Sequence, residues 1–330
     1  PKKKNTVRGK EHPIAIVHAP GLATSVQDLG RRGGEVFGLS RGGAADMVSA
    51  ALANRALANP SDACVLECTL VGPELEFLSS TQIVFAGASV EASLNGAPLA
   101  ALVPHMAARG ARLRMGPING GARVYLAVQG GWQGGLFFGS RATHLTAGAG
   151  GYAGRILAGG DHLYAEAFGP QSRTANSKMG PISFVRSLNQ PVKILRVTAG
   201  PEWPVGADTA TLAQLAGPFR ATQDISRMGI RLNAQGDEMT IGADPLTLPP
   251  IISGPVFPGT VQWPNKDVPI LLGCDCQATG GYPRVMQVIE ADLPLIGQVR
   301  PGDQIWFRVV SAAKALAHRA KLKAQFPEIF

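Results

Sequence analysis

The stretch Cys274-Asp-Cys-Gln-Ala-Thr-Gly-Gly-Tyr-Pro-Arg284 lies between two apolar runs, residues 268–272 and 285–289. Runs of this length and composition predict buried strands, so the stretch between them is expected to connect two strand ends. A turn requires the two glycines, but it does not require a carboxylate, an amide, a hydroxyl and a phenol close together. Polar groups at the end of a buried strand are typical of a functional site. The simpler alternative is a Gly-Gly hairpin with polar surface residues.

The composition favours a fold built mainly from β-strands. The 330 residues include 41 glycines and 25 prolines, which disfavour long helices and favour many tight turns. Short apolar runs recur roughly every ten residues, as expected of a barrel or a sandwich. Only two helices are predicted, over residues 46–57 and 311–323, with Asp46 and Ser311 as their N-caps.

The net charge of +8 comes from the two ends of the chain. Residues 1–11 and 308–330 each carry five basic residues against one glutamate, so the body between them has no excess charge. A nucleic-acid groove needs basic side chains on a folded surface. We therefore expect no nucleic-acid partner and interpret both ends as solvated tails. The alternative is a nuclear or nucleic-acid-binding arm formed by Lys2, Lys3 and Lys4.

Cysteine spacing and hydropathy exclude further classes. The four cysteines occur as Cys64/Cys68 and Cys274/Cys276. Neither spacing suits zinc, so we expect no metal and buried free thiols, with a metal or redox pair at Cys274 and Cys276 as the alternative. No apolar stretch reaches the roughly 18 residues of a membrane span, and residues 2–10 do not resemble a secretory leader. The sequence thus predicts no membrane partner and a cytoplasmic location.

Three segments carry a family resemblance. They are Pro20-Gly-Leu-Ala-Thr-Ser-Val-Gln-Asp-Leu-Gly-Arg31, Ser226-Arg-Met-Gly-Ile-Arg-Leu232 and Gln277-Ala-Thr-Gly-Gly-Tyr-Pro283. Together they resemble the allophanate hydrolase subunit 2 family, also called the KipA family or the family of the 5-oxoprolinase C subunit. This family recurs as half of the carboxyltransferase domain of urea carboxylase. The resemblance runs from about residue 14 to about residue 307, and it implies two cyclophilin-like β-barrel lobes with few short helices.

The expected domain organisation follows from composition and from this resemblance. Residues 1–13 are polar and basic and predict a disordered arm. A first β-barrel lobe is expected over residues 14–185, with a glycine-rich loop at 130–160. A second, cyclophilin-like barrel lobe is expected over 190–310, followed by a helix and tail over 311–330.

The candidate site consists of carboxylates, amides, a phenol and arginines. The sequence offers no nucleophile elbow, phosphate loop or histidine-rich metal site, and its six histidines are scattered. Carboxylates accept from substrate N–H groups, and arginine holds a carboxylate with two hydrogen bonds, so the set suits amide, urea or carboxylate substrates. We expect catalytic roles for Asp275, Gln277 and Tyr282, and substrate binding by Asp28, Arg31, Glu67, Arg227, Gln262, Thr279, Gly280 and Gly281.

Two expectations concern the geometry around Asp275. Asp275, Gln277, Thr279 and Tyr282 should line one pocket with residues 226–231. Loss of Asp275 should also impair catalysis far more than stability. The alternative makes Asp275 a turn residue that accepts hydrogen bonds from nearby backbone N–H groups.

A structural alternative exists for two other members of the set. Asp28 would cap the turn at Gly30, and Glu67 would form an ion pair with Arg55 or Arg31.

The family resemblance implies three possible functions. The first is a component of an ATP-dependent 5-oxoprolinase, which opens a lactam together with a subunit 1-type partner (KipI, or a protein like the 5-oxoprolinase B subunit) and a hydrolase like the 5-oxoprolinase A subunit. This chain would then bind no cofactor alone, and its partners would supply the ATP chemistry. The second is a component of a carboxyltransferase for a urea-like or amide substrate, with biotin on a separate carrier. The third is a non-enzymatic regulator that binds the companion subunit.

Overall fold

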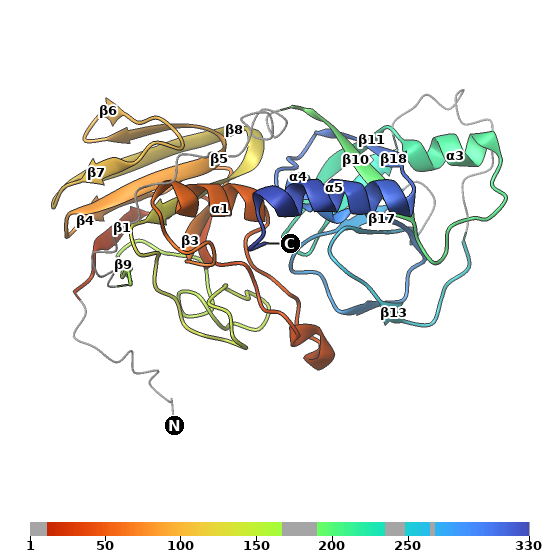
Figure 1. Ribbon diagram of the computed structural model, residues 1–330, viewed down its shortest axis with the longest axis horizontal. Helices are drawn as coiled ribbons and strands as arrows, with labels where there is room; N and C mark the ends of the chain where they lie inside the picture. The colour runs from red at the N-terminus through yellow and green to blue at the C-terminus, as the bar shows by residue number, and fades with distance from the viewer. Residues whose placement is uncertain (1–11, 167–189, 235–247, 265–267, 330) are drawn as a thin grey trace.

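The computed structural model describes residues 12–166, 190–234, 248–264 and 268–329, which form two lobes side by side (Figure 1). The first lobe is a nine-stranded sheet that runs β2-β3-β8-β4-β1-β9, with β5 paired along β8. The strands are β1 Ala15–Ala19, β2 Ala23–Gln27, β3 Val65–Thr69, β4 Glu74–Phe77, β5 Thr81–Leu94, β6 Ala97–Pro98, β7 His105–Ala107, β8 Arg112–Val128 and β9 His162–Leu163.

The first sheet curls because its two longest strands bend. The β5–β8 ladder shifts register between Gly87 and Ser89 and again between Val90 and Ala92. Such bulges bend a strand and increase its twist. The curled sheet encloses a core that includes Phe77, Phe85, Leu113, Leu126 and Trp132.

Helix α1, Met47–Ala56, covers the outer face of this sheet. It begins at Asp46, whose side chain accepts a hydrogen bond from Ser49 N, as predicted from the sequence. Its small side chains allow close approach to the strands beneath, where Ala51 packs with Val65, Val84 and Tyr125.

The second lobe is a closed barrel of seven strands in the order β10-β17-β14-β15-β12-β11-β18. All neighbours are antiparallel except β10 and β18, whose parallel pairing closes the barrel. Phe219 lies at the centre of its core, with its ring 5.6 Å from that of Phe307 and 6.0 Å from that of Trp263. The strands are β10 Val192–Ala199, β11 Phe219–Ile225, β12 Gly229–Ala234, β14 Thr260–Gln262, β15 Ile270–Leu272, β17 Arg284–Val288 and β18 Gln304–Val309, with a separate pair β13 Gly254–Pro255 and β16 Thr279–Gly280.

The predicted fold class is confirmed: the described chain is mainly β with few short helices. One barrel is closed and the other lobe is a curled, open sheet. The helix over residues 46–57 is confirmed. The run Met239-Thr-Ile241 also predicts a strand, but it lies outside the described residues. The sequence patterns did not predict η1 Gly34–Phe37, η2 Glu290–Asp292, α3 Thr209–Ala216 and α4 Leu293–Ile296.

The predicted domain limits at residues 1–13 and near 185–190 fall mainly outside the described ranges. Within those ranges the first sheet ends at Leu163 and the barrel begins at Val192. No described helix is long and apolar enough to cross a membrane.

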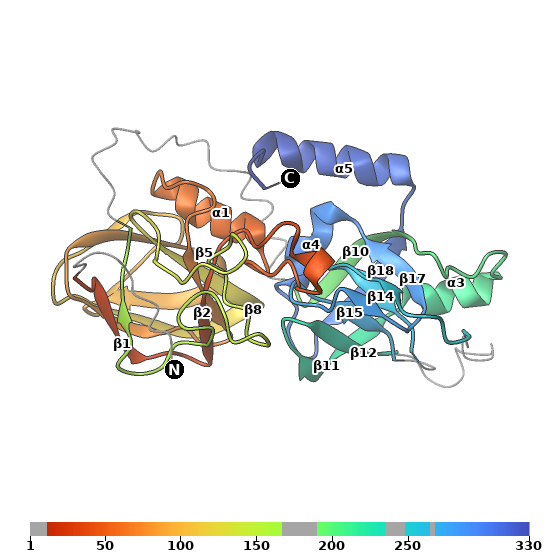
Figure 2. The same ribbon diagram turned by 90° about the horizontal axis from the view of Figure 1, so that it is seen from below.

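The C-terminal segment joins the two lobes. Helix α5, Ala312–Gln325, runs along the second lobe and ends beside α1 of the first (Figure 2). No residue of α5 itself is buried. Beyond the helix, Phe326 and Ile329 are each 2% exposed and pack against the α1 side of the first lobe. The prediction of a solvated tail is therefore wrong for residues 326–329, because the side chains of Phe326 and Ile329 are buried against the first lobe.

Replacing Phe326 with alanine should lower the free energy of unfolding by about 3 kcal/mol, because the ring is buried and its loss leaves a cavity. Urea denaturation monitored by tryptophan fluorescence measures the change. Leu316→Ala in α5 is the matched control, because Leu316 is 63% exposed, and it should change stability by less than about 0.5 kcal/mol. Equal losses in the two variants would contradict a docked tail.

Candidate functional site

Arg227 joins the two lobes through a buried cluster of charges. It lies in the connection between β11 and β12 of the barrel, and its Nη1 donates to Glu67 Oε1 of β3 at 2.5 Å. Its Nη2 also donates to the carbonyl oxygen of Gly43 at 2.6 Å. Within its own lobe, Nε and Nη2 hold the two oxygens of Asp275 at 2.7 and 2.9 Å. This two-point pair fixes the guanidinium as it reaches across.

Glu67 is the acceptor at the centre of the cluster. Its side chain is 1% exposed and also accepts from Arg123 Nε at 3.2 Å, Tyr125 OH at 3.0 Å and Ala45 N at 2.8 Å. Burial alone would raise the pKa of this carboxyl, but Arg227 and Arg123 outweigh burial and lower it. Glu67 is therefore a fixed carboxylate with its acceptor sites occupied, which suits a structural role.

A second set of hydrogen bonds extends the contact between the lobes. Gln298, which follows α4, donates to Asp46 Oδ2 at 2.9 Å and accepts from Arg123 N at 3.0 Å. Asp46 N in turn donates to Tyr125 OH at 2.7 Å. The cap of α1 and the barrel thus belong to one hydrogen-bonded network.

Glycines make this close approach possible. A Cβ on Gly273 would lie 2.3 Å from the carbonyl oxygen of Arg227. A Cβ on Gly42, which has φ +63°, would lie 2.7 Å from Arg31 Nη1 and 3.4 Å from Asp275 Oδ1. Only glycine fits at these two positions, so both glycines allow the backbone to pack against its neighbours in the cluster.

Arg31 is buried beside the cluster, and two of its three guanidinium nitrogens have no hydrogen-bond partner. Only 1% of it is exposed; its Nη2 donates to Ala142 O at 2.6 Å, but Nε and Nη1 have no partner. Burial lowers its pKa, and the charges of Asp275 and Asp28 partly offset that effect. Its guanidinium lies 5.4 Å from the centre of the Phe137 ring. A buried cation with two free N–H groups favours a carboxylate or carbonyl ligand.

A serine and a histidine lie close to Arg31, beside Phe137. Ser40 Oγ is 3.1 Å from His144 Nε2, and the His144 ring is 6.4 Å from that of Phe137. Ala147 N donates to His144 Nδ1 at 3.1 Å, which assigns the ring proton of the neutral form to Nε2. Burial lowers the pKa of His144 and so favours that neutral form. His144 therefore donates to Ser40, whose own hydroxyl proton remains available to a ligand.

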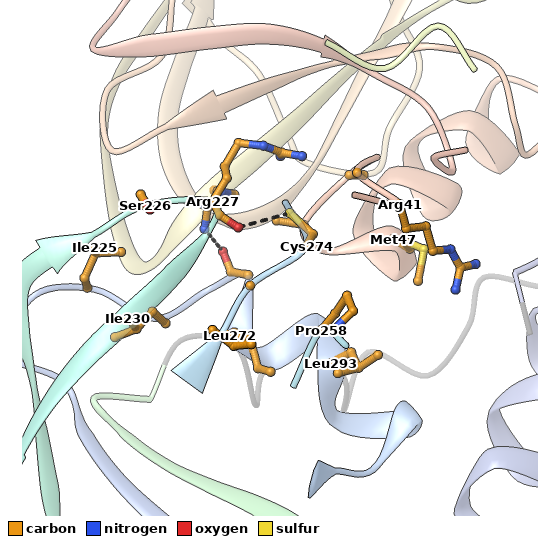
Figure 3. Close-up of a pocket in the computed structure, with 17 residues that line it drawn as sticks. Arg41, Met47, Ile225, Ser226, Arg227, Ile230, Pro258, Leu272, Cys274 and Leu293 are labelled. Atoms are coloured by element: carbon orange, nitrogen blue, oxygen red, sulfur yellow. Dashed lines mark hydrogen bonds between the residues drawn. The ribbon is translucent and has the colours of Figure 1, made fainter. Parts of the chain in front are cut away.

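A small cavity of about 50 Å³ lies between the lobes beside Arg227 (Figure 3). Cys274 lines it, and the Cys274 thiol donates weakly to the carbonyl oxygen of Arg227 at 3.9 Å. Burial raises the pKa of this thiol to about 12, so it is neutral and a poor nucleophile. Much of the remaining wall is apolar and includes Met47, Ile225, Ile230, Leu272, Leu293 and Ile296.

Gln262 and the polar residues that follow Asp275 lie apart from this cavity. Gln262 is buried with its Nε2 unpartnered. A Cβ on Gly280 would lie 2.6 Å from Gln262 Nε2 and 3.4 Å from Gln277 Nε2, so the two amides face the same glycine. Thr279 is exposed in β16, and Tyr282 is 50% exposed.

The structure thus brings together part of the predicted set. Glu67, Arg227 and Asp275 are in contact, and Arg31 lies beside them. The expectation that Asp275, Gln277, Thr279 and Tyr282 line one pocket with residues 226–231 is wrong. Only Asp275 contacts that segment, because the chain turns after Cys276 and carries the later residues towards β13.

Of the structural roles suggested for Asp28 and Glu67, the structure confirms the first and contradicts the second. Asp28 does cap the turn at Gly30, accepting from its N–H at 2.7 Å, and also binds Ser140 Oγ at 2.7 Å and Arg141 N at 2.6 Å. Glu67, however, pairs with arginines 123 and 227, and neither Arg55 nor Arg31 is its partner. Gly281 lies near Ser253, away from the charge cluster.

The pair of Asp275 with Arg227 changes what is expected of this aspartate. It accepts from the guanidinium rather than from the turn backbone. Its removal should therefore lower stability as well as any activity, in contrast to the sequence expectation.

Sequence reasoning missed Ser40, His144, Arg41, Arg123 and Gln298. Ser40 and Arg41 lie in a glycine-rich segment between two motifs, which is a usable signal. Nothing near His144 or Gln298 distinguishes them before the fold is known. Within the described part of the chain, no group of three or more His, Cys, Asp or Glu side chains could hold a metal ion.

The fold and this cluster define a carboxyltransferase-type domain. Residues 37–309 match the family described as carboxyltransferase domain, subdomain A and B, and the chain belongs to that family. It is 34% identical over 318 residues to the C subunit of 5-oxoprolinase from Escherichia coli (strain K12), covering 96% of this chain and 97% of that protein. The resemblance inferred from the sequence motifs is confirmed.

Urea carboxylases contain a similar domain. The chain is 31% identical to a putative urea carboxylase of Emericella nidulans, covering 94% of this chain but 25% of that protein. The crystal structure of the Kluyveromyces lactis urea carboxylase superposes with a TM-score of 0.82 at 28% identity, covering 98% of this chain and 29% of that chain. The chain therefore corresponds to the whole of one relative and to about a quarter of the others.

Glu67→Gln should lower the free energy of unfolding at pH 7 by about 3–5 kcal/mol, because it leaves Arg123 without its carboxylate and weakens the hold on Arg227. The lowered pKa of Glu67 means that its contribution is complete above the unfolded value of 4.5 and is lost as the pH falls through the folded value. The difference between wild type and Glu67→Gln should therefore shrink below about pH 4.5.

Denaturation at pH 7 and pH 4 measures this effect. Glu74→Gln is the control, because its pair with Arg114 is partly exposed and is worth at most about 1 kcal/mol. A pH-independent gap would show that Glu67 is not held as a carboxylate.

Proposed function

We propose that this chain is a component of an ATP-dependent 5-oxoprolinase complex, a hydrolase that opens the lactam ring of 5-oxoproline. The observation that carries the proposal is the end-to-end match with the C subunit of 5-oxoprolinase, which leaves almost no part of either chain uncovered. The proposed partners are a subunit 1-type protein and a hydrolase of the A-subunit type, which would supply the ATP chemistry. The proposed location is the cytoplasm.

The chemistry of the buried groups supports this substrate class. 5-Oxoproline carries a carboxylate and a lactam amide. The free Nε and Nη1 of Arg31 offer two hydrogen bonds to a carboxylate or to a lactam oxygen. The hydroxyl of Ser40, oriented by His144, offers a third donor. In this proposal the chain binds and orients the lactam, and the donors stabilise negative charge that develops on its oxygen.

A carboxyltransferase activity is the second candidate, favoured by the family match and by the likeness to urea carboxylase. In this case biotin would arrive on a separate carrier, and the same donors would hold a urea or amide substrate.

Reconstitution with partner subunits separates the two functions. Co-expression with a subunit 1-type protein and a hydrolase of the A-subunit type should give ATP-dependent formation of glutamate from 5-oxoproline. If the complex instead carboxylates urea with a biotinylated carrier and leaves 5-oxoproline unchanged, the second candidate holds.

Arg31→Lys should lower kcat/KM of the assembled complex by about 10- to 100-fold. The substitution keeps the charge but removes the forked N–H groups, and hydrogen bonds to charged groups are each worth about 1.5–3 kcal/mol. Steady-state kinetics measure the loss, and melting temperature confirms folding. Arg112→Lys, at a largely exposed arginine of β8, is the control and should retain wild-type kinetics. Unchanged kinetics in a folded Arg31→Lys complex would exclude Arg31 from the site.

A further inference from the structure

A second, larger cavity lies between helix α5 and the barrel. Its volume is about 420 Å³, within the range of small-molecule sites. Ala315, Leu316 and Arg319 of α5 form one wall. The opposite wall comes from the barrel and the 257–258 segment, with Phe257 and Val288 as apolar members.

The helix wall of this cavity is held at a few points only. No residue of α5 is buried. Arg319 Nε pairs with Glu290 at 2.5 Å, and Arg196 Nη1 lies 2.7 Å from His318 Nδ1. Phe326 then anchors the end of the segment in the first lobe. The helix therefore forms one side of this open cavity and does not fill it.

Arg41 lies where this cavity and the cavity between the lobes meet. Arg41, Pro258 and Leu293 line both cavities. Figure 3 shows the Arg41 side chain pointing away from Arg227 and Cys274, past Met47.

The Arg41 guanidinium lacks a matched anion. Its Nε is buried without a partner, and no ion pair among the described residues includes Arg41. Two carboxylates, Glu290 and Glu35, interact electrostatically with Arg41. Glu290 is already paired with Arg319, and Glu35 is exposed. Burial and the neighbouring charge of Arg32 lower the pKa of Arg41 more than Glu290 and Glu35 raise it. A partly desolvated cation of this kind favours an anionic ligand.

We propose that the cavity between α5 and the barrel binds a small organic carboxylate, with Arg41 as the anion-binding residue and Phe257 and Leu316 against the apolar body of the ligand. Gln287 contributes shape rather than recognition, because its amide is already bonded to Pro258 O at 2.8 Å and to Thr260 Oγ1 at 2.8 Å. This site is separate from the Arg31 site and does not depend on the proposed function. 5-Oxoproline belongs to the ligand class, so the cavity can serve as an entry or regulatory site for the same compounds.

Isothermal titration calorimetry on the whole chain tests the proposal with three probes. 5-Oxoproline and glutarate carry carboxylates, whereas 2-pyrrolidinone keeps the lactam and lacks the acid. Both carboxylates should bind saturably, and 2-pyrrolidinone should bind at least about tenfold more weakly, because it cannot pair with the guanidinium.

Three variants locate the binding. Arg41→Gln should weaken carboxylate binding at least about tenfold. Ala315→Phe should block it by filling the cavity from the α5 side while leaving Arg41 intact. Arg308→Gln, in the separate cavity on the other side of α5, should bind as wild type does. Melting temperature confirms the folding of each variant.

Two results would overturn the proposal: no saturable carboxylate binding by the folded wild-type chain, or equal binding by wild type, Arg41→Gln and Ala315→Phe. If Arg41→Gln fails to fold, Ala315→Phe decides alone. Because these measurements need no partner protein and no turnover, their failure leaves the proposed enzyme function standing. Binding here without 5-oxoprolinase activity in the complex would refute only that function.

Discussion

The contact of Arg227 with Glu67 and Asp275 is the interaction on which the arrangement of the lobes depends. A guanidinium buried between two β-structures is costly unless its N–H groups are paired, and here one carboxylate comes from each lobe. The pair with Asp275 orients the side chain, and the bond to Glu67 sets how the barrel meets the curled sheet. A hydrophobic contact alone would allow sliding, whereas directional hydrogen bonds select one relative position.

The same cluster sets the surroundings of the candidate site. Gly42 lies close to both Arg31 and Asp275, so the position of Arg31 is linked to that of the lobe contact. The cavity beside Arg227 shares Arg41 with the larger cavity under α5. Changes in how the lobes meet would therefore move both arginines, although neither belongs to the ion pairs that hold the lobes together.

The sequence predicted the fold class better than it predicted the site. Strand length, turn residues and the Asp46 cap are local signals, so the β content and α1 followed directly from them. The curl of the first sheet depends on bulges in β5 and was not predictable from period-two patterns. The docking of Phe326 was missed because isolated apolar residues in a basic tail give no periodic signal.

The candidate site shows the same division between local and long-range information. The polar stretch after Gly273 was recognised as unusual, but its members diverge, with Asp275 in the lobe contact and Tyr282 at the surface. We expected these residues to line one pocket because they are close in sequence. Sequence spacing, however, does not reveal the direction in which a loop turns. The Ser40–His144 contact spans more than one hundred residues, and only the folded backbone could show it.

The parallel pairing of β10 with β18 affects how the chain folds during translation. These strands are the first and last of the barrel, so the barrel cannot close until residues 304–309 have left the ribosome. Until then the barrel that holds Arg227 against Glu67 is incomplete. A topology dominated by such distant pairings folds slowly and exposes apolar strands in the meantime. Biogenesis of this chain should therefore be more sensitive to chaperone supply and translation speed than its finished stability suggests.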